Sequence, residues 1–317
     1  MSLLKVSAPP HISTKDDVSL IMFDVILALM PAMAAGAYFF GYRAIVVVMI
    51  SVLSAAAFEH IWNMIFKRKA TVSDLSAVVS GILLGFNLPS TVPLWIPVVG
   101  SFFMIIIVKM CFGGLGHNFM NPALAGRAFL MASWPAIMTK GFVSPFYKLE
   151  LVDTSYAVTS ATPLNSEFAG NVGIWDLFIG NVGGCIGETS ALALLIGGAY
   201  LLIRRIITWR IPVCYIGTVA VISAIFGESI PVQLFAGGLM LGAIFMATDY
   251  TTSPVTPKGQ IIYAIGCGIM TCIIRFAGGY PEGVSYSILL MNIAAPLFDK
   301  LTPPKIYGKK KRGAENA

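Results

Sequence analysis

The stretch LIMFDVILALMPAMAAGAYFF, residues 20–40, decides the fold class of this chain. A helix needs about 20 mostly apolar residues to cross the hydrocarbon core of a bilayer. This stretch is long enough, and Asp24 is its one charged side chain. It follows Lys15, Asp16 and Asp17, and no small-residue cleavage site follows a short apolar core. We therefore interpret it as a retained membrane helix rather than a signal peptide.

The composition of the whole chain agrees with this interpretation. Of its 317 residues, 57% are hydrophobic and 11% are charged. Soluble domains carry about 25% charged residues, so the composition excludes a soluble protein. The five cysteines lie in or beside apolar stretches and form no C-x-x-C pair. Buried thiols are therefore expected, rather than disulfides or a metal site.

Further apolar stretches extend over most of the chain. Backbone within a bilayer must satisfy its own hydrogen bonds, so helices are the expected spanning elements. The sequence predicts an all-α polytopic membrane protein with one transmembrane domain over residues 20–299, preceded by a segment 1–19 and followed by a basic tail 300–317. About ten spans are predicted, at residues 20–40, 44–66, 75–89, 94–111, 122–138, 183–203, 211–227, 232–249, 260–277 and 283–299.

The basic residues predict the orientation of these spans. One side receives Lys5, Lys15, Lys67, Arg68, Lys69, Arg204, Arg205, Arg210, Lys258, Lys300, Lys305, Lys309, Lys310, Lys311 and Arg312. The other side receives Arg43, Lys140, Lys148 and Arg275. The positive-inside rule assigns the first group to the cytoplasm. Both termini are then cytoplasmic, and the loop 139–175 is extracytoplasmic. The net charge of +6 is explained as this topology signal, without a nucleic-acid partner.

The two halves of the chain show a weak internal similarity. Residues 80–85 (SGILLG) resemble residues 237–242 (GGLMLG), and Asn121-Pro122-Ala123 is more weakly similar to Asn292-Ile293-Ala294. With five helices per half, the second copy would be inverted, which is an arrangement that often encloses a site near the bilayer midplane. Chance likeness between glycine-rich apolar helices is the alternative.

The longest polar connection contains a short run of hydroxyl residues, Thr159-Ser160-Ala161-Thr162. Long loops in compact proteins are usually functional or disordered. The run therefore offers a threonine hydroxyl for covalent modification. An ordinary turn is the alternative, because Ser, Thr and Pro favour turns for local backbone reasons.

A glycine-rich cluster over residues 113–129 (GGLGHNFMNPALAGRAF) offers amides beside aromatic rings. Asn118 and Asn121 are three residues apart, so on a helical turn they would share a face. Phe119 and Phe129 are available to pack against an aromatic ligand. The alternative is a close helix crossing with glycines as packing notches.

A second glycine-rich cluster, residues 180–190 (GNVGGCIGETS), places Glu188 within a predicted membrane helix. An ionisable group there is costly and by default indicates function. Residues 248–254 (TDYTTSP) form a related polar patch. The charges Asp24, Glu59, Asp249 and Arg275 are expected to be interfacial. The chain has no phosphate-binding loop, dinucleotide fingerprint or H-E-x-x-H motif, which argues against ATP hydrolysis and zinc proteolysis.

Residues 158–164 (VTSATPL), 117–129 and 184–190 together give the chain a resemblance to a known family over nearly its whole length. This is the RnfD/NqrB family, which comprises RnfD of the Rnf complexes and NqrB of the sodium-pumping NADH:quinone reductase. The short segment before the first helix resembles the Rnf member. The family motif often has an aspartate six residues before its acceptor threonine; here that residue is Tyr156, with Asp153 three residues further upstream.

The resemblance implies FMN bound covalently to Thr162 by an extracytoplasmic flavin transferase, with Thr159, Ser160, Gly187, Glu188 and Thr189 around it. It implies a second, noncovalent flavin, riboflavin, near Asn118 and Asn121, with Asp249 contacting a flavin or an ion path.

The implied function is electron transfer within a ferredoxin:NAD oxidoreductase that transports Na⁺ or H⁺ across the bacterial inner membrane. The implied partners are the other Rnf subunits (A, B, C, E and G) and membrane lipid. Alone, this chain would have no complete activity, because it lacks nucleotide and iron–sulfur motifs. A solute channel or secondary transporter, as the repeat suggests, is the main alternative. A structural subunit whose loop docks partners is another.

Overall fold

The computed structural model describes residues 17–68, 71–140, 142–143, 145–146, 164, 173–278 and 283–303. Over these ranges the regular elements are helices, as the sequence predicts. Three of them are long and apolar enough to cross a membrane: α1 (Val18–Phe40), α2 (Tyr42–Ile65) and α12 (Pro257–Ala277). Shorter apolar helices are α3 (Ser76–Phe86), the continuous pair α4 and η2 (Trp95–Met110), α8 (Ala191–Ile203) and α9 (Arg210–Ile225).

Apart from π-helical segments, the remaining elements of the described residues are two helices of 12 and 18 residues, α5 and α13, and five shorter ones. They are η1 (Val72–Asp74), α5 (Pro122–Ser133), α6 (Pro135–Lys140), α7 (Ile174–Ile179), α10 (Ile230–Phe235), α11 (Leu239–Leu241) and α13 (Val284–Leu301). Two segments have π-helical hydrogen bonding, η2 (Phe103–Met110) and η3 (Gly242–Met246).

Several predicted spans are interrupted, which corrects the expectation of continuous helices. The span 75–89 is helical only to Phe86, and the span 183–203 only from Ala191. The span 232–249 breaks between α10 and α11, where Gly237 has a φ of +69°. The span 122–138 breaks at Trp134, because the residue before a proline is pushed out of the helical region. Glycine and proline therefore divide these apolar stretches into half-helices.

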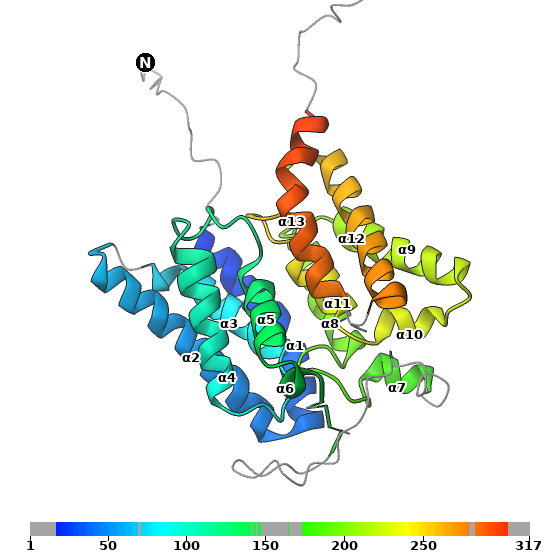
Figure 1. The fold of residues 1–317 in the computed structure, drawn as a ribbon, viewed down its shortest axis with the longest axis horizontal. Coiled ribbons are helices and arrows are strands. Elements are labelled where there is room, and N and C mark those ends of the chain that lie inside the picture. The colour runs from blue at the N-terminus through cyan, green and yellow to red at the C-terminus, as the bar shows by residue number, and fades with distance from the viewer. Residues whose placement is uncertain are drawn as a thin grey trace, which may run out of the picture.

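The helices form two groups that meet along the middle of the molecule (Figure 1). In the N-terminal group, α2 packs against α3 and α4; in the C-terminal group, α12 packs against α9 and α13. The groups are joined by contacts of α1 with α8 and of α5 with α13. Where α5 meets α13, the side-chain oxygen of Asn292 accepts from the Asn121 backbone N–H at 3.1 Å, with the Asn292 amide in the orientation that satisfies its neighbours.

The outer surface of the bundle carries large apolar side chains. Leu53 is 62% exposed, Ile203 is 81% exposed and Ile225 is 74% exposed, each on a different helix. Apolar side chains that face outward on several helices suit a lipid environment. The described structure therefore supports a membrane protein.

Candidate functional site

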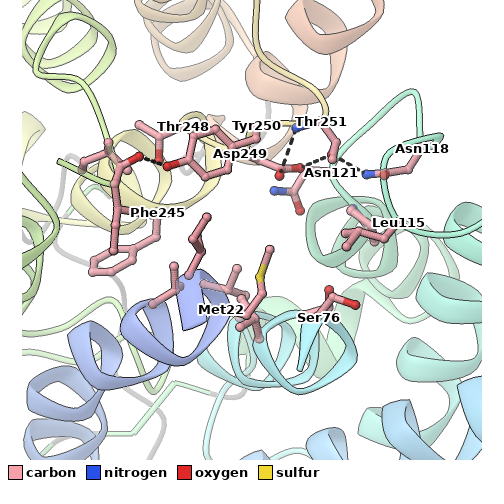
Figure 2. Close-up of a pocket in the computed structure, with 18 of the residues that line it drawn as sticks. Met22, Ser76, Leu115, Asn118, Asn121, Phe245, Thr248, Asp249, Tyr250 and Thr251 are labelled. Atoms are coloured by element: carbon pink, nitrogen blue, oxygen red, sulfur yellow. Dashed lines mark hydrogen bonds between the residues drawn. The ribbon is translucent and has the colours of Figure 1, made fainter. Parts of the chain in front are cut away.

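A pocket lies where α1 and α3 begin and where η2 and α8 end. It encloses about 760 Å³ of space between atoms, its open mouth included. Like small-molecule sites, it combines apolar walls with a few polar groups. Figure 2 shows Asn118, Asn121 and Asp249 on one side of the pocket and Met22 and Ser76 on the other. The sequence-predicted residues of the second flavin site are thus brought together.

Asn118 lines this pocket and carries a buried acceptor. Its Nδ2 donates to Thr251 Oγ1 at 3.0 Å and to the Met120 carbonyl at 3.3 Å. Its Oδ1 is buried and has no hydrogen-bond partner among the described residues. A buried acceptor without a donor is costly, so a ligand N–H at this point would be stabilising.

Asn121 reaches the same pocket as the N-cap of α5. Its Oδ1 accepts from the backbone N–H groups of Ala123 and Leu124, and its Nδ2 donates to the Met246 carbonyl at 3.2 Å. The expectation that Asn118 and Asn121 share one helical face is wrong, because Asn118 precedes the helix in a non-helical turn. The two meet at the pocket because the chain turns into α5 between them.

Asp249 lies in the turn after η3. Thr251 and Thr252 donate their hydroxyl hydrogens to its Oδ2, at 2.9 and 3.1 Å. Since Thr251 also accepts from Asn118, the carboxylate and the amide belong to one hydrogen-bonded chain (Figure 2). Asp249 therefore lines the pocket, as one of the two roles considered for it from the sequence would require. Partial burial raises the pKa of the neighbouring Tyr250 phenol, which keeps it protonated to donate to the Ile206 carbonyl.

The opposite wall holds a buried ion pair. Lys109, at the end of η2, donates to Glu59 Oε2 at 2.7 Å and to Ser76 Oγ at 2.6 Å. Glu59 is fully buried, not interfacial as expected, because the ammonium and the Thr71 hydroxyl neutralise and satisfy its carboxylate. Sequence reasoning missed Lys109, although a lysine within an apolar span is itself a functional signal.

A second buried polar centre surrounds Glu188. Arg127 Nη1 lies 2.7 Å from Glu188 Oε1 and 2.6 Å from Asn87 Oδ1. Glu188 is not within a helix as predicted; it lies in the non-helical segment before α8. That segment pairs with the end of α3, where Gly187 N–H donates to the Phe86 carbonyl at 3.0 Å. A Cβ at Gly187 would lie 2.2 Å from Phe86 Cγ, so only glycine allows this approach.

The candidate acceptor Thr162, with Thr159 and Ser160, lies outside the described residues. Leu164, two residues further along, is described. It packs against the apolar cluster of Leu177, Val182, Val232 and Ala236. A Cβ at Gly237 would lie 2.7 Å from Leu164 Cδ1, and one at Gly238 would lie 2.6 Å from Glu188 Oε1. Leu164, the last residue of the stretch 158–164, therefore lies beside the glycine pair that adjoins Glu188.

The structure also describes the surroundings of three further candidates from the sequence, Thr189, Arg275 and Asp24. Thr189 is buried, and its Oγ1 has no partner within the described part of the chain. Arg275, in the last turn of α12, is partly buried, and its Nη1 donates to the carbonyl and the side-chain oxygen of Gln233, at 2.6 and 3.1 Å. Asp24 is also buried, and accepts from Tyr200 and Arg204. No cluster of potential metal ligands occurs among the described residues.

Comparison with known proteins places the chain among membrane electron-transport proteins. Residues 5–308 match the NQR2, RnfD, RnfE family. The chain is 56% identical to the D subunit of the Na(+)-translocating ferredoxin:NAD(+) oxidoreductase complex of Acetobacterium woodii, over 96% of this chain and 95% of that protein. It is 41% identical to the D subunit of the proton-translocating ferredoxin:NAD(+) oxidoreductase complex of Clostridium ljungdahlii, over 98% of each.

A more distant relative is named in the same way. The chain is 36% identical to the D subunit of the ion-translocating oxidoreductase complex of Stutzerimonas stutzeri, over 94% of each protein. The resemblance noted in the sequence is thus confirmed, and together with the apolar helices it indicates a multi-pass membrane protein. The family match over almost the whole chain, and the near-complete overlap with these relatives, show that the chain belongs to the NQR2, RnfD, RnfE family.

Proposed function

We propose that this chain is the flavin-carrying membrane subunit of an ion-translocating ferredoxin:NAD oxidoreductase, with a noncovalent flavin in the pocket of Asn118, Asn121 and Asp249. The observation that carries the proposal is that Asn118 and Asn121, from one segment, and Asp249, from another far along the chain, line the same pocket. The relatives' names supply the reaction class. Riboflavin is the flavin that the resemblance favours.

The residues of the pocket fit a flavin ring. Such a ring is planar and largely apolar, and one edge carries an N–H between two carbonyl oxygens. Asn118 Oδ1 is a buried acceptor for that N–H. Leu115, Phe245 and Met22 provide apolar walls (Figure 2). The flavin would supply one-electron chemistry, while the protein binds it, orients it and shields it from water.

We further propose that Thr162 carries FMN through a phosphoester bond, with Thr159, Ser160, Gly187, Glu188 and Thr189 around it. The position of Leu164 supports this. Leu164, two residues further along the chain, packs against Gly237, whose neighbour Gly238 adjoins Glu188. A covalent bond on the outer side of the membrane would keep the cofactor from being lost.

The proposed topology has ten spans, both termini in the cytoplasm and the loop 139–175 outside the cytoplasmic membrane of a bacterium. A five-plus-five inverted repeat is supported by the way the two groups of helices meet. Under that repeat, α1 corresponds to α8 and α5 to α13, and these are the pairs that pack across the junction. Interrupted helices at the junction fit the same architecture.

The remaining Rnf subunits (A, B, C, E and G), membrane lipid and an extracytoplasmic flavin transferase are the proposed partners. Electrons would pass between ferredoxin and NAD, coupled to Na⁺ or H⁺ transport, which are the reactants and ions in the relatives' names. This chain's own residues would bind and orient two of those carriers.

Flavin fluorescence on a denaturing gel tests the covalent site. We expect a fluorescent band for the wild-type chain and for Thr159→Val, and none for Thr162→Val, with all three proteins present in equal amounts. Noncovalent flavin released by denaturation should remain near one per chain in each case. A fluorescent band from Thr162→Val would contradict the proposed acceptor, and a chain without either flavin would contradict the proposed function.

A further inference from the structure

We infer that Lys109 is a positioning residue for the pocket's flavin: its ammonium, held by Glu59 and Ser76, favours the negative charge that reduction brings into the pocket. This inference rests on the proposed function and assigns a role to a residue that neither the motifs nor the family resemblance identified. It is carried by the placement of the ammonium, the backbone that holds it and the other charges around the pocket.

The first argument is the geometry of the ion pair. Lys109 and Ser76 both line the pocket, while Glu59 lies behind them and is fully buried. The ammonium has three hydrogens, and two are used within the described structure, on Glu59 Oε2 at 2.7 Å and on Ser76 Oγ at 2.6 Å. One hydrogen therefore remains for an acceptor in the pocket.

The second argument is that the carboxylate partner is itself fixed. The Thr71 hydroxyl donates to Glu59 Oε1 at 2.5 Å, and Asn63 donates to Thr71 at 2.9 Å. Ser76, in turn, donates to Asp74 Oδ1 at 2.5 Å. Each group that orients the ammonium is therefore oriented by another residue. Such a support is what a precisely placed functional charge requires.

The third argument is the backbone on which these residues lie. Lys109 lies near the end of a π-helical segment, and π-helical turns often occur at functional sites. Leu75, directly before Ser76, has a φ of +62°, which is unusual for a residue other than glycine. Such conformations cost energy and persist where the surrounding structure demands them. Both irregularities place a polar group on this wall of the pocket.

The electrostatic consequence follows from the charges around the pocket. Asp249, on the opposite side, already accepts hydrogen bonds from Thr251 and Thr252. Among the described residues that line the pocket, Lys109 is the positively charged one, and the carboxylate of Glu59 lies behind it. When the donor loses one electron and the ring gains it, one negative charge enters a low-dielectric site near the ammonium. The positive end of the pair favours that reduction, and no proton has to leave Lys109.

Redox titration of the purified complex tests this role. In Glu59→Gln the ammonium loses its counter-charge, so the noncovalent flavin should become easier to reduce, by about tenfold in the one-electron equilibrium constant, or ~59 mV. In the double variant Glu59→Gln/Lys109→Met both charges are gone. The noncovalent flavin should then be harder to reduce than in the wild type, by a potential shift of similar size. The double variant also avoids leaving a buried carboxylate unpaired.

Asp24→Asn is the matched control, because it breaks an ion pair with Arg204, whose side chain is 54% exposed and therefore screened by solvent. Its flavin potential should equal that of the wild type. Shifts in the same direction in both Glu59 variants, or no shift in either, would overturn the role of Lys109 while leaving the flavin pocket intact. A wild-type complex without noncovalent flavin would overturn the pocket assignment and this inference together.

Discussion

Arg127 and Glu188 form an ion pair with an Nη1–Oε1 distance of 2.7 Å, and neither side chain is more than 3% exposed. The pair joins α5 to the non-helical segment before α8, and Arg127 also binds Asn87 beyond the end of α3. Three interrupted segments therefore meet at one buried cation. Backbone N–H groups outside the helices also find protein acceptors here, as Gly187 does on the Phe86 carbonyl, because a membrane interior offers no water.

Removing one partner of this pair should strongly destabilise the protein. Arg127→Met leaves the Glu188 carboxylate buried and unpaired, and we expect a loss of about 3–5 kcal/mol. Thermal unfolding in detergent, followed by near-ultraviolet circular dichroism, measures the change. The double variant Arg127→Met/Glu188→Gln should recover a large part of the loss. If the single and double variants unfold at the same temperature, the pair does not couple these segments.

Gly187→Ala should be destabilising for a different reason. Its Cβ would lie 2.2 Å from Phe86 Cγ, so the segment before α8 would have to move away from α3. Overpacking of this kind costs about 1–3 kcal/mol. Gly217→Ala is the control, because nothing lies within 4 Å of its Cβ position. We expect a lower midpoint for Gly187→Ala alone and partial recovery on adding Phe86→Ala; equal midpoints for the two glycine variants would show that the close approach is absent.

Asn118→Leu should empty the proposed flavin pocket. The change keeps the size of the side chain but removes the buried Oδ1 acceptor and the bond to Thr251. Loss of such a hydrogen bond costs a ligand about 1–3 kcal/mol, which is a factor of about 5 to 150 in affinity. The flavin content of the washed protein, read from its absorption spectrum after denaturation, measures this. Asn181→Leu is the control, since Asn181 is exposed and its side chain bonds only to Asp176 among the described residues. Full flavin retention in Asn118→Leu would contradict the assignment.

The orientation of the chain can be checked with a membrane-impermeant maleimide. Cys111 is the exposed native thiol among the described residues, and it follows Lys109 at the end that we assign to the cytoplasm. We expect Ser155→Cys, in the predicted extracytoplasmic loop, to react in intact spheroplasts, and Cys111 to react only after the membrane is opened. The reverse pattern would invert the proposed topology.

The sequence alone was enough to predict the all-helical membrane class. A bilayer requires about 20 consecutive, mostly apolar residues in a helix, and residues 20–40 meet that requirement without contacts from the rest of the fold. It also identified Asn118, Asn121 and Asp249 as polar groups in unusual surroundings. The family resemblance, since confirmed by comparison, connected them with a flavin.

Only the tertiary structure decided how the helices break and which polar groups meet. Hydropathy shows whether a segment prefers lipid, but an interrupted helix buried between neighbours is as apolar as a continuous one. The apolar stretch at 75–89 therefore gives no sign that α3 ends at Phe86. In the same way, no local pattern connects Lys109 with Glu59, 50 residues away. Such pairs depend on the packing of distant helices, because a buried charge is stabilised by whichever partner the fold brings to it.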